Sequence, residues 1–339
     1  MTHVTSPRRI LISRTDRAGD LTLTVPVFQA LKTLQPECHL TAHLRTYTAP
    51  LLRGHPAVDQ LIVDDPEGGL SLLALARTFR ESQFDAAILV HPSMRAILAA
   101  FLAGIPLRIG RASNLWQIFL NRRAHQHRSR NEKHEYQYNL DLLNALDIAP
   151  PDIAPRLFPD PALLPAVRQA LARAGLPNAR PWFVHPGHGG SALNLPLDQY
   201  AKLARELVQR EIPVCVTLGP GESALSQAFG QAIPDRFGFV TDLPDLSYVV
   251  ALLSLGRGWV GGSTGPMHLA AAVNLPVAAF FPPLPAMTPK RWGPVTRPAQ
   301  VFLPAIPQCP QHCSRCPSHP CMNTLDTLPV VEWISRHAL

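Results

Sequence analysis

Apolar residues in the first half of the chain follow two alternating patterns. Short, mostly apolar runs predict β-strands over residues 8–13, 38–44, 60–65, 84–91 and 106–110. Stretches with apolar residues at helical spacing separate them, over residues 20–34, 70–80 and 94–104. Pro26 falls early in the first of these helices, where it is either tolerated or causes a kink. This βαβα rhythm is typical of a mostly parallel sheet with helices on both faces.

A proline-rich stretch, residues 150–165, separates this block from a second block of the same kind. Its six prolines cannot hold a regular element and are typical of an interdomain linker. Strands are predicted over residues 181–187, 213–219, 258–262 and 275–283. Helices are predicted over residues 166–174, 197–211, 246–256 and 327–337.

We therefore predict an α/β fold in which two Rossmann-like domains face each other across a cleft. The predicted N-terminal domain covers residues 1–160 and a linker covers residues 161–180. The C-terminal domain covers residues 181–325. A final helix, residues 326–339, is expected to pack back towards the N-terminal domain.

Composition narrows the functional classes. The 339-residue chain is 46% hydrophobic, but its longest apolar run, residues 96–107, is shorter than the roughly 20 residues of a spanning helix. We expect a soluble cytoplasmic protein without a transmembrane segment, able to sit peripherally on the inner membrane. The net charge of +7 rests on 27 arginines and 4 lysines. Arginine suits phosphate oxygens, although codon bias explains the same excess. No basic stripe with interleaved aromatic residues supports nucleic-acid binding.

Glycine-rich turns follow strands in both blocks, at the sheet edge where open α/β folds bind ligands. In "SRTDRAGDLTLT", residues 13–24, Gly19 permits a tight turn and Asp20 stands at a helix start. Asp20 is therefore either an N-cap or a general base at the edge of the cleft. Asp16 is a weaker candidate for the same role.

The second block carries a glycine-rich loop, "HPGHGGSALNLP", over residues 185–196. Its backbone N–H groups can approach an anion closely, and it also has the composition of a plain strand–helix connection. The candidate anion contacts in this loop are Gly187, Gly189, Gly190 and Ser191.

Two further turns complete a predicted nucleotide site. "LGPGES", residues 218–223, offers Glu222 to ribose hydroxyls. "VGGSTGPMHLAAAV", residues 260–273, places a turn at a helix N-terminus, whose positive potential suits a diphosphate. Its candidate contacts are Ser263, Thr264, Gly265 and His268.

Several familiar motifs are missing from the sequence. No Gly-x-Gly-x-x-Gly follows the first strand, which argues against a nicotinamide oxidoreductase of similar rhythm. No His-Glu-x-x-His or Asp-x-Asp motif is present. Since Asp-x-Asp would clamp a metal to a nucleotide sugar, a metal-independent mechanism is favoured.

Taken in order, these stretches resemble the ADP-heptose:lipopolysaccharide heptosyltransferase family, glycosyltransferase family nine. The resemblance covers nearly the whole chain. Its segments are "ILISRTDRAGDLTLTVPVFQALK", "HPSMRAILAAFLAGIPLRIG", "NLDLLNALDI", "VHPGHGGSALNLPLDQYAKLA", "GGSTGPMHLAAAVNLPVAAFFPP", "RWGP" and "CMNTL…VVEWI". It implies a glycosyltransferase type B fold with no required cofactor. The C-terminal domain would hold an ADP-heptose donor, and the N-terminal domain would meet an inner-core lipopolysaccharide acceptor.

The resemblance also implies residue roles. Asp20 would deprotonate the acceptor hydroxyl, which attacks the anomeric carbon with inversion. The leaving ADP would be stabilised by Thr264, Gly265 and His268, and the ribose held by Glu222. Acceptor contacts are assigned to Gly19, His91 and Arg95.

Two departures from the family pattern concern the donor. Leu193 stands where family members commonly carry a lysine, and Ser263 stands where some heptosyltransferases carry an aspartate. The hypothesis of a catalytically weak sugar-nucleotide binding protein of the same fold therefore stays open. Lys290 or Arg291 could supply the missing charge.

Four cysteines cluster near the C-terminus, in the spacing C-x3-C-x2-C-x4-C. Short-spaced thiolates can bind structural zinc, but this spacing is not a paired CxxC. Free or partly oxidised thiols are the alternative. The residues are Cys309, Cys313, Cys316 and Cys321.

Overall fold

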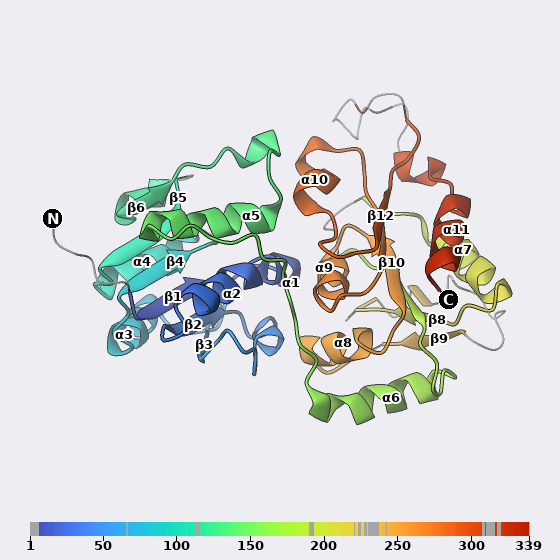
Figure 1. The fold of residues 1–339 in the computed structure, drawn as a ribbon, viewed down its shortest axis with the longest axis horizontal. Coiled ribbons are helices and arrows are strands. Elements are labelled where there is room, and N and C mark those ends of the chain that lie inside the picture. The colour runs from blue at the N-terminus through green and yellow to red at the C-terminus, as the bar shows by residue number, and fades with distance from the viewer. Residues whose placement is uncertain are drawn as a thin grey trace. The chain divides into compact units, whose positions relative to one another are not determined.

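The computed structural model consists of two compact units, Met1–Arg156 and Leu157–Leu339 (Figure 1). It describes residues 7–65, 67–112, 115–189, 193–219, 221–222, 225–226, 229, 237–241, 243–306, 309, 316 and 320–338. Each unit contains one parallel six-stranded sheet flanked by helices, which confirms the predicted α/β class with two Rossmann-like domains.

The first sheet has the strand order β3-β2-β1-β4-β5-β6, and every neighbouring pair is parallel. Its strands are β1 Arg9–Ser13, β2 His39–Leu44, β3 Gln60–Val63, β4 Ala86–Leu89, β5 Leu107–Arg111 and β6 Arg122–Ala124. The chain therefore adds β2 and β3 on one side of β1 and then returns to add β4 on the other side. That reversal is the topological switch point of the sheet.

Helices cover both faces of the first sheet. They are α1 Ala18–Thr22, α2 Val25–Leu34, α3 Leu72–Glu81, α4 Met94–Leu102 and α5 Glu135–Leu140. Short 3₁₀ turns are η1 Ala49–Leu51, η2 Leu115–Phe119, η3 Arg128–Arg130 and η4 Asp141–Leu146. On one face, Leu11 and Leu89 pack with Phe79 of α3 and Ile97 of α4. Helices α2 and α5 pack against each other away from that core (Figure 1).

The helix predicted over residues 20–34 is two helices in the structure. Helix α1 ends at Thr22, and α2 begins at Val25 with Pro26 in its first turn. Proline is favoured there because the first N–H groups of a helix have no partner inside the helix. Because of this break, Asp20 in α1 and the apolar face of α2 belong to two separate helices.

The second sheet repeats the same topology, with the order β12-β11-β10-β7-β8-β9, all parallel. Its strands are β7 Trp182–His185, β8 Val214–Thr217, β9 Phe237–Val240, β10 Gly258–Gly262, β11 Val277–Phe280 and β12 Ala299–Phe302. The switch point of this sheet lies between β7 and β10.

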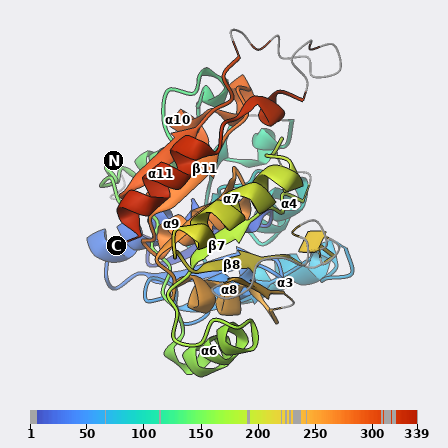
Figure 2. The ribbon, with the colours of Figure 1, turned by 90° about the vertical axis from the view of Figure 1, so that its right-hand side faces the viewer.

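The helices of the second unit are α6 Leu164–Arg173, α7 Leu197–Gln209, α8 Leu246–Leu253, α9 Gly265–Ala272, α10 Pro289–Trp292 and α11 Leu328–His337. Its 3₁₀ turns include η5 Pro161–Leu163, η7 Pro285–Met287 and η9 Cys321–Thr324. Helices α7 and α11 lie side by side over one face of the sheet (Figure 2). There Tyr200 of α7 and Trp333 of α11 join the core around Trp182.

The boundary between the units falls inside the proline-rich stretch, where residues 148–160 form no helix or strand. The predicted linker, residues 161–180, instead holds η5 and α6, and α6 packs on α8 of the second unit. The terminal helix α11 packs on α7, and its predicted packing towards the first domain stays a prediction. Within the described residues, the structure contains no helix both long and apolar enough to cross a bilayer.

Candidate functional site

The predicted site residues gather at the carboxyl ends of the switch-point strands of each unit. In the first unit, the loop after β1 carries Asp16 and leads to Asp20, and His91 follows β4. In the second unit, Gly187 follows β7 and Thr264 follows β10. Ligands of open α/β sheets bind at this edge, where crossovers on opposite faces leave a crevice.

One buried arginine organises the loop after β1. Arg14 is only 5% exposed, and its Nε donates to Oδ1 of Asp16 over 2.7 Å. Its Nη2 donates to Oδ1 of Asp20, also over 2.7 Å. Burial acts to lower the pKa of Arg14, but the charges of the two aspartates outweigh it, so the guanidinium stays charged.

Asp20 is not a helix N-cap, because the N-cap of α1 is Arg17 and Asp20 lies inside the first turn. Its side chain is 21% exposed, so the carboxylate lies at the surface end of the Arg14 cluster. The backbone around it is fixed from two sides. Oγ1 of Thr24 donates to the Asp20 carbonyl over 2.9 Å, and Nδ2 of buried Asn139 donates to the Leu23 carbonyl over 2.9 Å.

The two aspartates have opposite pKa shifts. Burial raises the pKa of Asp20, with Arg14 opposing and the negative charge of Asp16 adding to the rise. Burial also favours the neutral form of Asp16, but hydrogen bonding to His91 and the charge of Arg14 outweigh it and lower its pKa. His91 Nδ1 lies 3.3 Å from Oδ2 of Asp16. Asp20 is therefore the more basic carboxylate and the better proton acceptor.

A second ionic cluster lies beside the first, at the ends of β2 and β3. Arg95 of α4 donates to both carboxylate oxygens of Asp64, over 2.7 and 2.8 Å. Oδ2 of Asp64 lies 3.7 Å from Nε2 of His43, whose Nδ1 lies 2.9 Å from Oγ of Ser13. Ser13, His43 and Asp64 therefore link the ends of three neighbouring strands. Because Ser13 and His43 are fully buried, the serine hydroxyl is not accessible to a substrate as a nucleophile. Arg95 is thus held by Asp64, and its role in acceptor binding stays a prediction.

In the second unit, the loops after β7 and β8 are in contact. The backbone N–H of Gly219 donates to Oε2 of Glu222 over 2.8 Å. The same carboxylate lies so close to Gly187 that a Cβ there would collide with it. Nδ1 of His185 lies 2.9 Å from the carbonyl oxygen of Thr217. Burial lowers the pKa of His185, so its imidazole is neutral at pH 7. Gly187 and Glu222 therefore form one surface, as a shared nucleotide site requires.

Asn194 joins the loop after β7 to the end of β10. Its Nδ2 donates to the Pro186 carbonyl over 2.8 Å, and its Oδ1 accepts from the hydroxyl of Tyr200 over 2.8 Å. A Cβ at Gly262 would collide with the Asn194 side chain. Leu193 packs against the core of this unit.

The turn after β10 opens helix α9 with two buried polar side chains. Thr264 is the N-cap in an extended conformation, and it is 6% exposed. Within the described part of the chain, its Oγ1 has no hydrogen-bond partner. A buried hydroxyl left this way costs about 1–3 kcal/mol, which a ligand oxygen or hydrogen donor can recover. His268 is equally buried in the same turn, Gly265 is the first helical residue, and Ser263 is half-buried.

Several predicted residues are not tested by this geometry. Gly190, Ser191 and Cys313 lie outside the described residues. Gly189 follows His188 with a positive φ of 50°. Lys290 is exposed on α10, and the Arg291 guanidinium lies 4.8 Å from the Trp292 ring centroid.

The cysteine cluster is only partly visible. Cys321 belongs to the core of the second unit, while Cys309 and Cys316 are half-buried. In the ranges that the structure describes, no three His, Cys, Asp or Glu residues are placed to hold a metal ion. Because Cys313 is outside those ranges, the zinc hypothesis stays a prediction.

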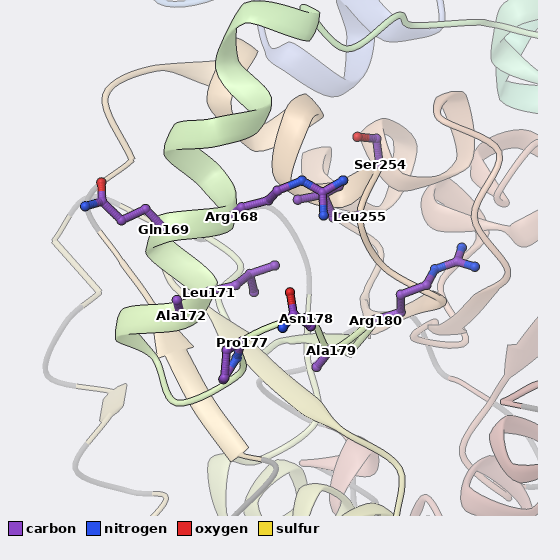
Figure 3. Close-up of a pocket in the computed structure, with 10 residues that line it drawn as sticks. All are labelled: Arg168, Gln169, Leu171, Ala172, Pro177, Asn178, Ala179, Arg180, Ser254 and Leu255. Carbon is purple, nitrogen blue, oxygen red and sulfur yellow. The ribbon is translucent and has the colours of Figure 1, made fainter.

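A cavity of about 510 Å³ opens in the second unit away from these loops (Figure 3). It is lined by α6, by residues 177–180 before β7, and by Ser254 and Leu255 before β10. In Figure 3 the Arg168 side chain extends from α6 towards Leu255. Since β7 and β10 are parallel, this cavity lies at their amino ends, on the sheet edge opposite the candidate site.

The sequence did not single out Arg14, Asn139 or Asn194. A charged residue directly after a buried strand was a usable signal for Arg14. Asn139 acts through a hydrogen bond to Leu23, 116 residues away, and Asn194 through its close approach to Gly262, which local patterns do not reveal.

Comparison with known proteins shows the family of the chain. The family model "Glycosyltransferase family 9 (heptosyltransferase)" matches residues 72–321. A Haemophilus influenzae protein named as a candidate glycosyltransferase is 33% identical over 302 residues, 85% of this chain and 86% of the relative. Lipooligosaccharide heptosyltransferase 2 of the same organism is 28% identical, over 83% of this chain and 85% of the relative.

Solved structures agree on the fold. The glycosyl transferase family 9 structure from Veillonella parvula superposes with a TM-score of 0.86 at 18% identity, covering 98% of this chain and 97% of that one. Escherichia coli ADP-heptose lipopolysaccharide heptosyltransferase II superposes with a TM-score of 0.81 at 20% identity, covering 97% and 98%. The predicted glycosyltransferase type B fold is confirmed by these likenesses and by the two sheets.

Proposed function

Because the chain belongs to glycosyltransferase family 9, the heptosyltransferase family, we propose that it moves a heptose or related sugar from an ADP-sugar to an inner-core lipopolysaccharide acceptor. The observation that carries the proposal is the Arg14 cluster. It holds two aspartates at the switch point and makes Asp20 the more basic of them. Membership of a glycosyltransferase family also makes the nicotinamide oxidoreductase hypothesis wrong.

In the proposed reaction, Asp20 is the general base. The acceptor hydroxyl oxygen forms a bond to the anomeric carbon while its proton passes to the Asp20 carboxylate. A carboxylate whose pKa is raised binds that proton better than an ordinary aspartate. Arg14 and His91 hold Asp16 ionised beside it, so Asp16 keeps its negative charge throughout the reaction. Gly19, His91 and Arg95 remain the proposed acceptor contacts.

The donor end of the reaction is assigned to the second unit. As the anomeric C–O bond breaks with inversion, the bonding electron pair leaves with the β-phosphate of ADP. The backbone N–H of Gly265 and the side chains of Thr264 and His268 would stabilise that charge at the start of α9. Glu222 would bind the ribose beside Gly187. The buried, unpartnered hydroxyl of Thr264 supports this assignment among the described residues.

The choice of donor and acceptor class rests on named relatives. A relative named lipooligosaccharide heptosyltransferase 2 supports a lipid-linked core sugar as the acceptor. A structural neighbour named for ADP-heptose supports an ADP-linked donor. Such an acceptor would bring the enzyme to the cytoplasmic surface of the inner membrane.

A weakly catalytic sugar-nucleotide binding protein is the second candidate. It is favoured by Leu193, which packs into the core where the family commonly has a lysine. Lys290 of α10 is the proposed replacement for that charge, and Lys290→Ala would then weaken ADP binding. An unchanged ADP affinity would exclude the replacement.

A donor screen tests the proposal. The protein is titrated with ADP-, UDP- and GDP-sugars, and each donor that binds is incubated with a lipid-free core oligosaccharide. We expect ADP-heptose to bind and mass spectrometry to detect one added heptose. Binding of ADP-heptose with no product from any core acceptor would support the second candidate instead.

A further inference from the structure

An exposed apolar patch covers the outer side of η2 in the first unit. Leu115 is 85% exposed and Ile118 is 68% exposed. In a 3₁₀ turn, side chains three residues apart eclipse each other, so these two share one face. Trp116 of η2 and the exposed end of α4, Phe101 and Leu102, complete what we call the η2 patch.

The η2 patch is firmly built on the core of the unit. Phe119, the last residue of η2, packs against Phe101 with 4.8 Å between ring centroids and the rings tilted by 55°. Leu120 is buried in the core beneath α3 and α4. The inner side of η2 is thus packed against the core, while Leu115 and Ile118 point to the outside of a well-packed turn. Large exposed apolar side chains grouped in this way mark interaction sites.

Arginines surround the η2 patch and contact its own residues. The Arg108 guanidinium lies 5.4 Å from the Phe101 ring centroid and donates through Nε to the Phe119 carbonyl over 2.8 Å. Arg80 donates to the Leu102 carbonyl, and Arg123 of β6 donates to the Leu120 carbonyl over 3.2 Å. Backbone carbonyls hold these side chains without neutralising their charge.

The sequence around the patch is strongly one-sided in charge. Between Asp85 and Glu132 it contains seven arginines and no aspartate, glutamate or lysine. Three of them, Arg95, Arg128 and Arg130, pair with carboxylates outside that segment, whereas Arg108 and Arg123 contact the patch. An anionic lipid surface attracts such a segment, and each basic residue near it contributes about 1 kcal/mol. Tryptophan and arginine beside aliphatic side chains are the composition of an interfacial membrane anchor.

We propose that the η2 patch docks the first unit on the surface of an anionic lipid bilayer, with Leu115, Trp116 and Ile118 entering the headgroup region. The partner is the membrane itself. The docking deepens the proposed function, because a lipid-linked acceptor would then be presented to a molecule already at the membrane.

A second copy of this chain is a poorer occupant. A two-fold dimer would place the patch against itself. Arg80, Arg108 and Arg123, which contact the patch, would then face the same arginines of the partner. Like charges across such an interface repel, whereas anionic headgroups would neutralise them.

Vesicle binding of the full chain tests the docking. Vesicles of phosphatidylglycerol and phosphatidylcholine in equal parts are compared with phosphatidylcholine alone, at low and at high salt. We expect binding to the anionic vesicles that weakens with salt. Leu115→Ser with Ile118→Ser should lower the binding constant on the order of a hundredfold. Arg80→Glu with Arg123→Glu should lower it by roughly tenfold or more.

Matched variants elsewhere in the chain serve as controls. Leu328→Ser removes another exposed leucine, and Arg173→Glu with Arg205→Glu makes the same change in net charge on the second unit. Both should keep vesicle binding within about twofold, as should Asp20→Asn. An equal loss of vesicle binding in the control variants would overturn the docking surface. So would vesicle binding that is unchanged in the patch variants. So would a dimer that the patch variants abolish while vesicle binding is absent.

Activity separates this inference from the proposed function. With a lipid-free core oligosaccharide, the Leu115→Ser/Ile118→Ser protein should turn over at the normal rate. With the same acceptor in anionic vesicles it should lose activity in step with its binding. If the protein binds vesicles through the patch but transfers nothing, the proposed function fails and the docking surface stands. If transfer from vesicles proceeds equally in the patch variants, the docking surface fails and the proposed function stands.

Discussion

At the scale of single residues, Asp16 and Asp20 show how one arginine can hold two carboxylates in different states. Both accept from Arg14 over 2.7 Å. Asp16 also has a hydrogen bond to His91, which helps to lower its pKa. The pKa of Asp20 is raised by burial. Environments that push two pKa values apart are how active sites separate a permanent anion from a proton acceptor.

The pH dependence of transfer follows from these shifts. Asp20 acts only when ionised, so kcat/KM should fall as the pH drops through its pKa, which burial raises from the ordinary aspartate value. Arg14→Gln removes a positive charge that favours ionisation and should move this acid limb to higher pH. Arg17→Gln, at the exposed N-cap of α1, should leave the limb in place. If the acid limb of the kcat/KM profile stayed in place in Arg14→Gln, the result would contradict the electrostatic coupling between Arg14 and Asp20.

Thr264 gives a test at the donor end. Replacing its hydroxyl by a methyl group in Thr264→Val should weaken ADP binding by about 1.5–3 kcal/mol, the contribution of a hydrogen bond to a charged group. Thr264→Ser keeps the hydroxyl and should bind ADP nearly as well as the natural protein. Isothermal titration of both variants decides the point. Equal ADP affinities for the two variants would remove Thr264 from the diphosphate site.

At the scale of elements, the sequence predicted the strands that carry buried apolar runs, such as β1, β4 and β11. It did not predict β6, β9 or β12, which are edge strands that the sheet buries only in part. The single helix expected over residues 20–34 became α1 and α2 because Pro26 begins a new helix. Asp20 and Thr264 could be placed at strand ends from the sequence, since glycine turns mark those ends, and their roles in a site stay predictions. The pairing of Asp20 with Arg14 could not be predicted, because it depends on how α1 folds back.

Helix α11 should contribute strongly to the stability of the second unit. Trp333 packs edge-on against Trp182 at 6.0 Å between ring centroids, inside the core. Trp333→Ala should lower the free energy of unfolding by about 3–5 kcal/mol. Urea denaturation followed by circular dichroism measures the loss. Glu332→Ala, on the exposed face of the same helix, should change it by no more than about 0.5 kcal/mol. A loss for Trp333→Ala as small as the control's would show that α11 is not part of the core.

At the scale of the whole molecule, two sheets of identical strand order each present a switch point with different chemistry. The first unit offers a carboxylate base held by an arginine. The second offers glycine turns, a carboxylate and the start of α9. This division suits a reaction in which one unit activates an acceptor and the other holds a nucleotide donor. The strand order itself could not be predicted, since it depends on pairing between segments distant in the sequence.

The proposed mechanism needs no metal, because the sequence lacks the Asp-x-Asp motif that clamps a metal to a nucleotide sugar. Dialysis against EDTA should therefore leave the transfer rate unchanged, and added Mg²⁺ or Mn²⁺ should not raise it. A loss of activity that a divalent ion restores would contradict this part of the mechanism. Metal analysis of the same sample also tests the cysteine cluster, where stoichiometric zinc would favour a structural site.

The most direct test of the account is the rate of sugar transfer by Asp20→Asn, measured with ADP-heptose and a lipid-free core acceptor. Asparagine keeps the shape of the side chain but cannot take the proton. Loss of a general base should reduce kcat by roughly 10²–10⁴-fold, with ADP affinity unchanged. Asp141→Asn, which changes a partly exposed carboxylate paired with Lys133 at the start of η4, should keep full activity. Transfer by Asp20→Asn at the rate of the natural protein would contradict the account.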